Sequence, residues 1–484
     1  MVTSLPTRLQ VHPHLLAAVL TGDGLRCLNG PLAKRSFHTF CVTRLRVTRP
    51  GRAHNHAMQK LRFTALAMVI AVIATFAAVM LVLNLTAGEK KVRQQLPRLY
   101  STADPSFQRA MGSLLGPGIV PGNAVKALLN GDEIFPPMLQ AIRSAQRSIT
   151  FETYIYWSGD IGKQFADALS ERARAGVKVH VLLDWVGSAK IEDSYLKGMT
   201  EAGAQVQTFH KPKWYDLARL NNRTHRKLLV VDGQIGFTGG VGIAPAWTGH
   251  AQDAEHWRDT HFQIEGPVVA QMQATFLDNW LKVTGEVTHG DAYFPALQPV
   301  GMLRAQMFSS SPSSGSESMQ LMYHMAISAA ARSIDLSAAY FVPDELTRQL
   351  LLDALKRGVR VRLITPGKII DTKAVRAASR GTWGPLLQAG AEIYEYQPTM
   401  HHCKVMIVDQ LMVSVGSTNF DNRSFRLNDE ANLNVYDATF AARLTQVFEQ
   451  DLVQSQRVTL AQWAARPLTE KVKERLALLL HSQL

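Results

Sequence analysis

Two stretches of the chain show the same order of polar and apolar positions. In each, a lysine is followed by four apolar residues and then an aspartate, from Lys227 to Asp232 and from Lys404 to Asp409. A turn follows, and a second apolar run ends in small residues. Short apolar runs bounded by turns are typical of buried strands. The pattern therefore predicts a strand–turn–strand unit that is made twice.

The repeat extends to the elements before these units. Arg-Ser-Ile at 147–149 recurs at 332–334, and the Gly-Val start of the apolar run at 176–183 recurs at 358–364. Helix-like stretches separate the strand-like runs in both halves, which favours parallel sheets with helices packed outside. One motif per half predicts a site between the halves. The expected fold class is α/β, with similar domains at 126–290 and 316–484 and a linker at 291–315.

The N-terminal part has a different pattern. Residues 63–83 form a stretch of 21 residues without a charge. As a helix it would be about 31 Å long, close to the thickness of a bilayer core. We expect one transmembrane helix here. A basic leader at 1–62, expected to be disordered, precedes it, and a polar connector at 84–125 follows.

Charges on either side of this helix bear on its orientation. Basic residues are denser before the helix than after it, which weakly favours a cytoplasmic N-terminus and an extracytoplasmic body. The predicted location is therefore the cell (inner) membrane, with a single pass. Met58 would also suit as the first residue of a membrane protein, and with that start the bias disappears.

The basic charge of the chain lies mostly in its leader. The formal net charge is +13, from 52 Lys and Arg against 39 Asp and Glu. Residues 1–62 contain ten of the basic residues and one acid, so the remainder is only mildly basic. That balance fits a site for an anionic phosphate but not a long nucleic-acid groove. Three cysteines, at 27, 41 and 403, provide neither a disulfide framework nor a metal cluster.

The candidate chemistry begins with His225 and Lys227 and with His402 and Lys404. Residues two apart in a strand share a face, so each histidine points the same way as its lysine. A lysine can hold a phosphate while a histidine attacks it or transfers a proton. Two cations and oriented donors can offset phosphoryl charge, so no metal or other cofactor is expected.

Carboxylates complete the candidate site. Asp232 and Asp409 belong to the repeated catalytic motifs, but seven residues of strand span roughly 23 Å. We therefore expect both aspartates to stabilise the local fold rather than to contact the phosphate. Asp259 and Glu430, near the start of the next apolar runs, are the candidates to orient the histidines.

These paired motifs resemble those of the phospholipase D superfamily. Three further stretches resemble bacterial cardiolipin synthases: residues 221–233, Trp257–His261 and Ala339–Asp344. The resemblance implies two α/β domains with one shared active site. It also implies a membrane-anchored phosphatidyltransferase that joins two phosphatidylglycerols into cardiolipin and glycerol through a phosphatidyl-histidine. A phospholipid hydrolase with the same site is the first alternative, and a nuclease of the superfamily the second.

Roles within the site follow from this resemblance. We expect His225 to be the nucleophile and His402 the general acid and then base, although the sequence leaves the reverse assignment open. Ser417 and Asn419 are expected to bind phosphate oxygens. The first motif instead ends in Gly239, Gly240 and Gly242, where synthases usually carry an asparagine in place of Gly242.

On the first side, phosphate contacts would then rest on Lys227 and on the backbone N–H groups near Gly239 and Gly240. The aromatic residues that flank the first motif would line an acyl groove, with packing in the core as an equal alternative. These residues are Trp214, Tyr215, Trp247 and Trp257.

Overall fold

The structure is a computed structural model of the chain, and it describes residues 52–86, 92, 94–210, 221–312, 318–479 and 483. Most of the basic leader therefore lies outside the described residues, as do Trp214 and Tyr215.

Helix α1 spans Arg52–Thr86. Its segment Gln59–Met80 has a mean hydropathy of 2.5 and is long and apolar enough to cross a membrane. The helix starts well before the charge-free stretch. Residues 52–62, which we expected to be part of a disordered leader, are therefore helical. Backbone hydrogen bonding continues readily through the basic residues because Lys and Arg are good helix formers.

The first domain of the body contains the strands and helices of the first half of the repeat. Its strands are β1 (Val120–Leu129), β2 (Ser148–Thr153), β3 (Lys178–Asp184), β4 (Gln205–Phe209), β5 (Arg223–Thr224), β6 (Leu228–Val231), β7 (Ile235–Gly239) and β8 (Thr260–Glu265). Its helices are α3 (Asn130–Ser144), α4 (Asp160–Arg174), α5 (Asp193–Glu201), the 3-10 turn η1 (Pro245–Trp247) and α6 (Val269–Thr284).

The second domain repeats this order. Its strands are β9 (Leu303–Ser310), β10 (Ser333–Ala338), β11 (Phe341–Val342), β12 (Arg360–Pro366), β13 (Glu392–Tyr396), β14 (Lys404–Val408), β15 (Met412–Gly416), β16 (Phe420–Asp421), β17 (Asn428–Tyr436) and β18 (Ser455–Val458). Its helices are α7 (Met319–Ala329), α8 (Glu345–Lys356), α9 (Lys373–Gln388), α10 (Asn422–Arg426), α11 (Ala438–Val453), α12 (Leu460–Ala464) and α13 (Leu468–Leu478).

Each domain has a mixed sheet rather than the parallel sheet that we expected. Strands β2, β3 and β4 pair in parallel, as do β10, β12 and β13. The hairpins β6–β7 and β14–β15 and the strands beside them are antiparallel. Helical crossovers enforce parallel pairing, whereas the short turn after each motif aspartate allows only an antiparallel hairpin.

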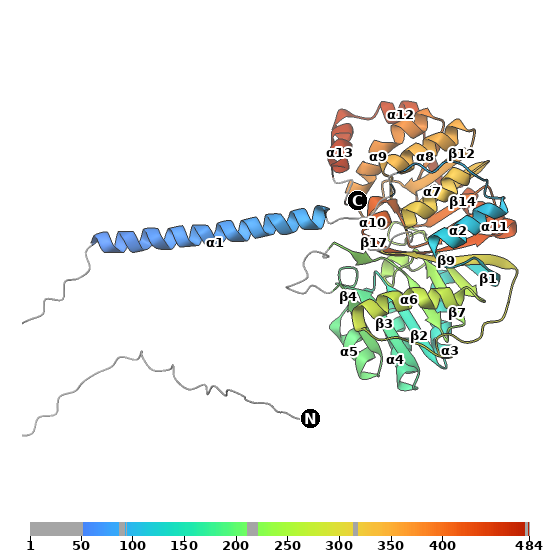
Figure 1. Cartoon of the computed structure of the whole chain (residues 1–484), viewed down its shortest axis with the longest axis horizontal. Helices are drawn as coiled ribbons and strands as arrows, with labels where there is room; N and C mark the ends of the chain where they lie inside the picture. The colour runs from blue at the N-terminus through green and yellow to red at the C-terminus, as the bar shows by residue number, and fades with distance from the viewer. Residues whose placement is uncertain are drawn as a thin grey trace, which may run out of the picture. The chain divides into compact units, whose positions relative to one another are not determined.

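The two sheets meet at β1 and β9, which pair antiparallel. Figure 1 shows the first domain, in green, and the second, in orange and red, on opposite sides of these strands. One apolar cluster contains Val230 and Phe262 from the first domain and Ile407 and Leu433 from the second. The body therefore shares a core across the domain boundary.

The predicted connector and linker contain elements of the body. Helix α2 (Pro105–Leu115) buries Phe107, Met111 and Leu115 in the core of the second domain. Strand β9 lies within the predicted linker and pairs with β17 along Arg304–Ser310. We did not predict either element from the sequence. Each is short, and its mixture of polar and apolar residues resembles that of a connecting segment.

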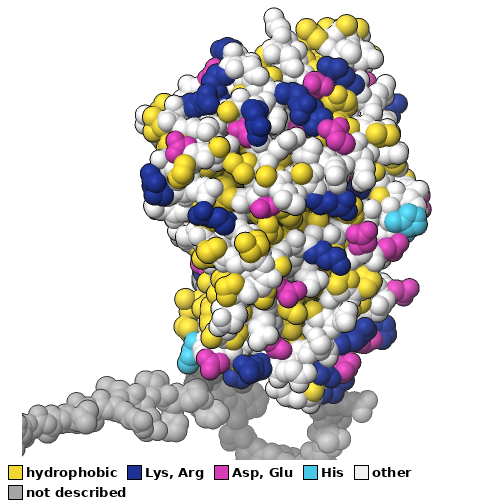
Figure 2. All heavy atoms as spheres, turned by 90° about the vertical axis from the view of Figure 1, so that its right-hand side faces the viewer, with side chains coloured by type: hydrophobic (Ala, Val, Ile, Leu, Met, Phe, Trp, Pro, Cys, Tyr) yellow, Lys and Arg dark blue, Asp and Glu magenta, His cyan; other side chains and the backbone are white. Residues whose placement is uncertain are grey.

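The surface of the body mixes both signs of charge. On the face shown in Figure 2, basic and acidic side chains alternate among apolar and uncharged ones, without a continuous basic stripe. A groove for a nucleic-acid backbone would need such a stripe. This face therefore agrees with the mildly basic composition of the body.

Candidate active site

A pocket of about 420 Å³ lies between the two domains. His225 and Lys227 line it from the first domain, and His402 and Asn419 line it from the second. The structure thus brings both predicted histidines to one cavity. The other lining residues are Tyr154, Ile155, Trp157, Arg223, Trp247, Trp257, Tyr340, Asp371, Thr372, Val375, Asp421, Arg423, Asn428 and Gln483.

His225 takes its carboxylate partner from the other domain. Its Nδ1 lies 3.1 Å from both carboxylate oxygens of Glu430, which is fully buried in β17. The Ser417 hydroxyl donates to Glu430 Oε2 at 2.5 Å. A carboxylate that binds Nδ1–H fixes the tautomer and leaves Nε2 with a lone pair.

His402, in the second domain, takes its carboxylate partner from the first domain. Its Nδ1 lies 2.7 Å from Oδ2 of Asp259, which precedes β8 of the first domain. The Trp247 indole N–H donates to the same oxygen at 2.9 Å. The two orienting carboxylates are therefore exchanged between the domains.

This exchange follows from backbone contacts between the domains. The N–H of His225 donates to the carbonyl of Asp429, and β5 pairs in parallel with the start of β17. The N–H of His402 donates to the carbonyl of Arg258. Each histidine thus lies beside the residue that precedes the other domain's carboxylate.

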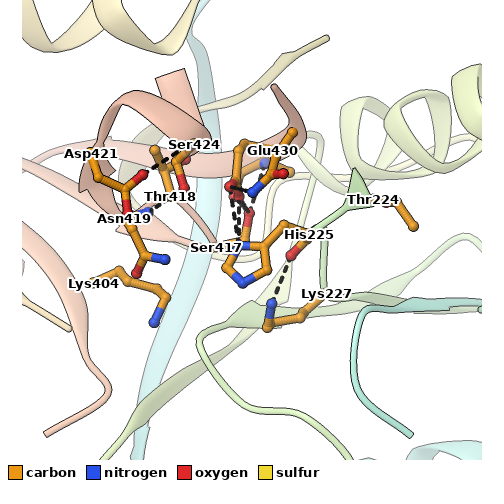
Figure 3. Close-up of polar contacts among 12 residues, drawn as sticks. Thr224, His225, Lys227, Lys404, Ser417, Thr418, Asn419, Asp421, Ser424 and Glu430 are labelled. Carbon is orange, nitrogen blue, oxygen red and sulfur yellow. Dashed lines mark hydrogen bonds and ion pairs between the residues drawn. The ribbon is translucent and has the colours of Figure 1, made fainter. Parts of the chain in front are cut away.

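The lysines lie close to their own histidines. Lys227 Nζ donates to the carbonyl of His225 at 2.7 Å, and Lys404 Nζ donates to that of His402 at 2.8 Å. Lys404 Nζ also lies 3.2 Å from both ring nitrogens of His402. Figure 3 shows the Glu430 carboxylate at one ring nitrogen of His225, with Ser417 bound to that carboxylate, while the other ring nitrogen points away from it.

Burial controls the protonation of the site. Desolvation lowers the pKa of His225 to about 4, although Glu430 opposes the shift. Desolvation also lowers the pKa of His402 and Lys404, and it lowers that of Lys227 to about 7. Burial would raise the pKa of Glu430, but His225 and Lys227 hold it below its usual value. These shifts favour neutral histidines beside ionised carboxylates.

Asp232 and Asp409 do not line the pocket. Asp232 accepts hydrogen bonds from the backbone N–H groups of residues 146–148. Asp409 accepts from those of residues 331–333 and from the Thr102 hydroxyl. Both aspartates take positive φ, 53° and 55°, in the turn after the first strand of the hairpin. Their contacts tie each hairpin to the strand beside it.

Ser417 also differs from its expected place. It does not line the pocket, and its hydroxyl donates to Glu430 instead of facing the space where a phosphate would bind. Asn419 does line the pocket, and its Oδ1 is buried without a hydrogen-bond partner in the described part of the chain. Asn419 thus faces the pocket, whereas the Ser417 hydroxyl is turned toward the Glu430 carboxylate.

Gly239 and Gly240 of the first motif leave space for the side chains of His261 and Asp259. They are not positioned to bind a phosphate through the Gly240 N–H. A Cβ on Gly240 would lie 2.3 Å from Asp259 Oδ1, and one on Gly239 would lie 2.6 Å from the His261 ring. The N–H of Gly240 donates to the carbonyl of Thr260. This N–H is therefore occupied, contrary to the expectation that it would bind phosphate.

Gly242 lies against Trp247. A Cβ there would lie 2.8 Å from Cβ of Ile155 and 3.1 Å from the Trp247 ring. An asparagine at this position, which the resemblance led us to expect, would collide with both. Trp247 occupies this space and stabilises Asp259, much as Ser417 stabilises Glu430 in the other half. The sequence marked Trp247 only as an aromatic residue beside the motif.

One other cluster has metal-ligand composition. His401, Cys403 and Asp451 are buried within ligand distance of one another. The Arg258 guanidinium, however, binds both oxygens of Asp451, at 2.9 and 3.0 Å. A metal ion would have to share Asp451 with this cation, so the donor set fits an ion pair better than a metal.

The comparisons with known proteins agree with this geometry. Residues 138–280 and 323–452 match the profile of the family described as cardiolipin synthase, PLD-like domain. The major cardiolipin synthase of Bacillus subtilis is 36% identical over 361 residues, which cover 74% of this chain and 75% of the relative. Cardiolipin synthase A of Pseudomonas fluorescens is 34% identical over 72% of this chain and 73% of the relative.

A solved structure shares the fold. Phosphatidylserine synthase from Haemophilus influenzae superposes with a TM-score of 0.58 at 13% identity, over 78% of this chain and all of that one. At this identity the likeness concerns the architecture alone. The family profile and the relatives above show that this chain belongs to the cardiolipin synthases, phosphatidyltransferases of the phospholipase D superfamily.

Proposed function

We propose that the protein makes cardiolipin from two phosphatidylglycerol molecules and releases glycerol. The observation that carries this proposal is the pair of buried histidines, each bound at Nδ1 to a carboxylate of the opposite domain. A double displacement at phosphorus needs one nucleophile and one group that first gives and then takes a proton. The two histidines, which line one pocket, supply both.

In this proposal His225 is the nucleophile. The lowering of its pKa to about 4 keeps its imidazole neutral near pH 7. Nε2 attacks the phosphorus of the first phosphatidylglycerol, a P–N bond forms, and the bond to the glycerol oxygen breaks. In this proposal Lys227, Lys404 and the amide N–H of Asn419 hold the phosphoryl oxygens.

His402 transfers the proton in both steps. It must be protonated when the donor reacts, and the bound phosphodiester anion favours that state because an opposite charge raises a histidine pKa. Nε2–H gives its proton to the departing glycerol. The neutral ring then removes the proton from a headgroup hydroxyl of the second phosphatidylglycerol, which attacks phosphorus and regenerates His225. Asp259, at 2.7 Å, stabilises the imidazolium.

Membrane attachment agrees with this substrate. The segment Gln59–Met80 is long and apolar enough to anchor the chain in a membrane. We propose the cell membrane as the site of action, with the body on the extracytoplasmic side. The dense basic charge before the helix supports that orientation.

The first experiment tests the reaction. Purified protein is incubated with phosphatidylglycerol vesicles, and the lipids are resolved by mass spectrometry, beside His225→Ala and His402→Ala. Cardiolipin from the wild type alone supports the proposal. Phosphatidic acid without cardiolipin would instead indicate a hydrolase.

A second experiment separates the roles of the histidines. A phosphatidyl donor with a p-nitrophenol leaving group needs little help from an acid. We expect His402→Ala to release one equivalent of nitrophenol in a burst, because the covalent step survives, and His225→Ala to give no burst. The opposite pattern would exchange the two assignments.

A further inference from the structure

We propose that helix α13 binds the surface of a membrane that contains anionic phospholipids. It would do so through an apolar stripe, which consists of Leu468, Val472 and Leu476 of the helix and Leu479 at its C-cap. The proposal assigns a second membrane contact, made by the body itself, in addition to the N-terminal helix. It rests on the proposed function only in that a lipid substrate gives such a contact a use.

The apolar stripe follows the period of an α-helix. Its members are spaced by four, four and three residues, so they project from one side of the helix. Their exposed fractions are 76% for Leu468, 48% for Val472, 59% for Leu476 and 78% for Leu479. Each of the other described helices of the body exposes at most one large apolar residue. The stripe is therefore a local concentration of exposed apolar surface, which is typical of an interaction site.

Basic side chains border this stripe. By the helical period, Lys471 and Arg475 lie along one edge of it and Lys473 lies beyond the other. Lys473 and Arg475 are exposed, and none of the three forms an ion pair within the part of the chain that the structure describes. A helix with an apolar face and basic flanks is the kind that lies in the interface of an anionic membrane.

The acidic residues of α13 are bound to arginines of the body. Glu474, only 3% exposed, accepts two hydrogen bonds from Arg466 Nε, at 2.7 and 3.0 Å. Glu470 Oε2 lies 3.6 Å from Arg380 Nη2 of α9. The charges of the helix are therefore sorted, with the acids paired and the basic residues left around the stripe. An anionic surface complements this arrangement.

A groove beside α13 extends the apolar surface. It has a volume of about 520 Å³ and lies against α9, α12 and α13. Trp463, Leu468 and Val472 supply apolar lining, and Lys471 and Arg475 supply cations. A phospholipid combines acyl chains with an anionic phosphate, so its two parts match these two kinds of lining.

The other side of α13 packs against the wall of the catalytic pocket. Ala477 and Leu478 belong to one apolar cluster with Val375 and Ala378 of α9, and Val375 also lines the pocket. Gln483, which follows the helix, lines the same pocket. Figure 1 shows α13 at the edge of the second domain, beside α9. A membrane bound to the stripe is thus separated by one helix from the wall of the pocket that the lipid enters.

A second copy of the chain fits this surface less well. In a two-fold dimer through the stripe, the same patch of each copy would face the other. Lys471, Lys473 and Arg475 of the two copies would then approach one another, and their like charges repel. Anionic headgroups instead attract these residues while the acyl region covers the stripe. The charges therefore favour a lipid surface over self-association.

A fluorescent probe at Leu476 tests the contact. Full-length protein with Leu476→Cys, in a Cys27→Ser and Cys41→Ser background, is labelled with nitrobenzoxadiazole, while Cys403 is buried and stays unlabelled. The protein is reconstituted into mixed phosphatidylglycerol and phosphatidylcholine vesicles, with or without doxyl-labelled lipids that quench probes inside the bilayer. Val453→Cys is the matched control, because Val453 is 82% exposed but isolated on α11, which Figure 1 shows on the side of the second domain away from α13.

We expect doxyl lipids to lower the emission at position 476 about twofold or more and to leave that at position 453 nearly unchanged, because only the stripe enters the bilayer. Phosphatidylcholine alone, or salt at about 1 M, should weaken the quenching at position 476. Equal quenching at both positions, or none at position 476, would overturn the docking. Quenching that ignores salt and headgroup charge would overturn the assignment to anionic lipid.

The same probe detects self-association. If a second copy covers the stripe, the emission at position 476 shifts to the blue as the protein-to-lipid ratio rises and does not respond to doxyl lipids. That result would also overturn the proposal.

Activity gives a second readout. The combined variant Leu468→Ser, Val472→Ser and Leu476→Ser removes exposed side chains only, so the fold should persist. We expect its rate on dilute long-chain phosphatidylglycerol in vesicles to fall about 3- to 10-fold relative to its rate on monomeric short-chain phosphatidylglycerol, because only the vesicle reaction uses docking. Val453→Ser should keep the wild-type ratio of the two rates.

An unchanged ratio in the combined variant would overturn a role of the stripe in catalysis at the membrane. A wild type that converts neither substrate would refute the proposed function instead. The quenching experiment needs no activity and still decides whether α13 binds the membrane.

Discussion

The two histidines of the pocket have different neighbours. The His225 ring lies 5.1 Å from the Tyr154 ring, whereas the His402 ring packs against a pair of tryptophans, 5.3 Å from Trp247 and 5.5 Å from Trp257. Their carboxylates differ as well, because a serine hydroxyl binds Glu430 and an indole N–H binds Asp259. Equivalent positions in the repeat therefore give unequal environments, as a nucleophile and an acid require.

Trp247→Phe tests the indole contact. Phenylalanine keeps most of the ring but loses the hydrogen bond to Asp259. We expect kcat to fall about tenfold or more, the usual effect of losing a hydrogen bond to a charged group. The effect should largely disappear in an Asp259→Asn background, because both changes act on one contact. Fully additive effects would show that Trp247 acts by some other route, and thermal unfolding controls for stability.

The lowered pKa of Lys227 leads us to expect that activity depends on pH. Burial lowers its pKa to about 7, so the free enzyme loses this positive charge as the pH rises above 7. A bound phosphate favours the charged form and raises the pKa. We therefore expect kcat/KM to fall above about pH 7 while kcat persists to higher pH. Lys227→Arg should move the fall in kcat/KM upward, and a wild-type kcat/KM that stays flat to pH 9 would contradict the assignment.

At the scale of elements, the strongest sequence signals were those that repeat. The hairpins β6–β7 and β14–β15 follow the paired motifs, since an apolar run and a turn are local properties. The carboxylates Asp259 and Glu430 could also be nominated from their positions. Their exchange between domains could not, because it depends on the pairing of β5 with β17 and on the contact between Arg258 and His402. Such contacts join residues far apart in the chain.

Other elements were misjudged for the same reason. Strand β9 occupies the segment that looked like a linker, and its role emerges only from its pairing with β1 and β17. Ser417 looked ready to bind a phosphate, but the folded chain turns its hydroxyl toward Glu430. Arg223 and Arg423 line the pocket but carried no motif signal at all. Tertiary contacts, rather than local pattern, decide the role of each of these residues.

At the scale of the whole molecule, a buried ion pair links the domains. Arg258 of the first domain binds Asp451 of α11, and its Nη1 donates to the Asp259 carbonyl at 2.6 Å. Burial would raise the pKa of Asp451, but Arg258 is the main cause that holds it at about 2. The pair therefore fixes the backbone that presents Asp259 to His402.

Arg258→Met should be strongly destabilising. It removes the main cationic partner of a buried carboxylate, a loss that costs about 3–5 kcal/mol of unfolding free energy. His401, whose Nε2 lies 3.4 Å from Asp451, offsets part of that loss. The double variant with Asp451→Leu should recover much of that loss, because an apolar pair can replace a buried ion pair. Denaturant unfolding measures both. Equal stability of Arg258→Met and wild type would mean that the pair contributes little.

The exchanged carboxylates also bear on how the two halves can change over time. Glu430 serves His225 and Asp259 serves His402, so neither domain contains a complete pair. A substitution at one carboxylate impairs the histidine of the other domain, and its compensation must arise across the boundary. A chimera with one domain from a relative would join each histidine to a foreign carboxylate. The two halves must therefore coevolve. A change of catalytic residues in one half requires a matching change in the other.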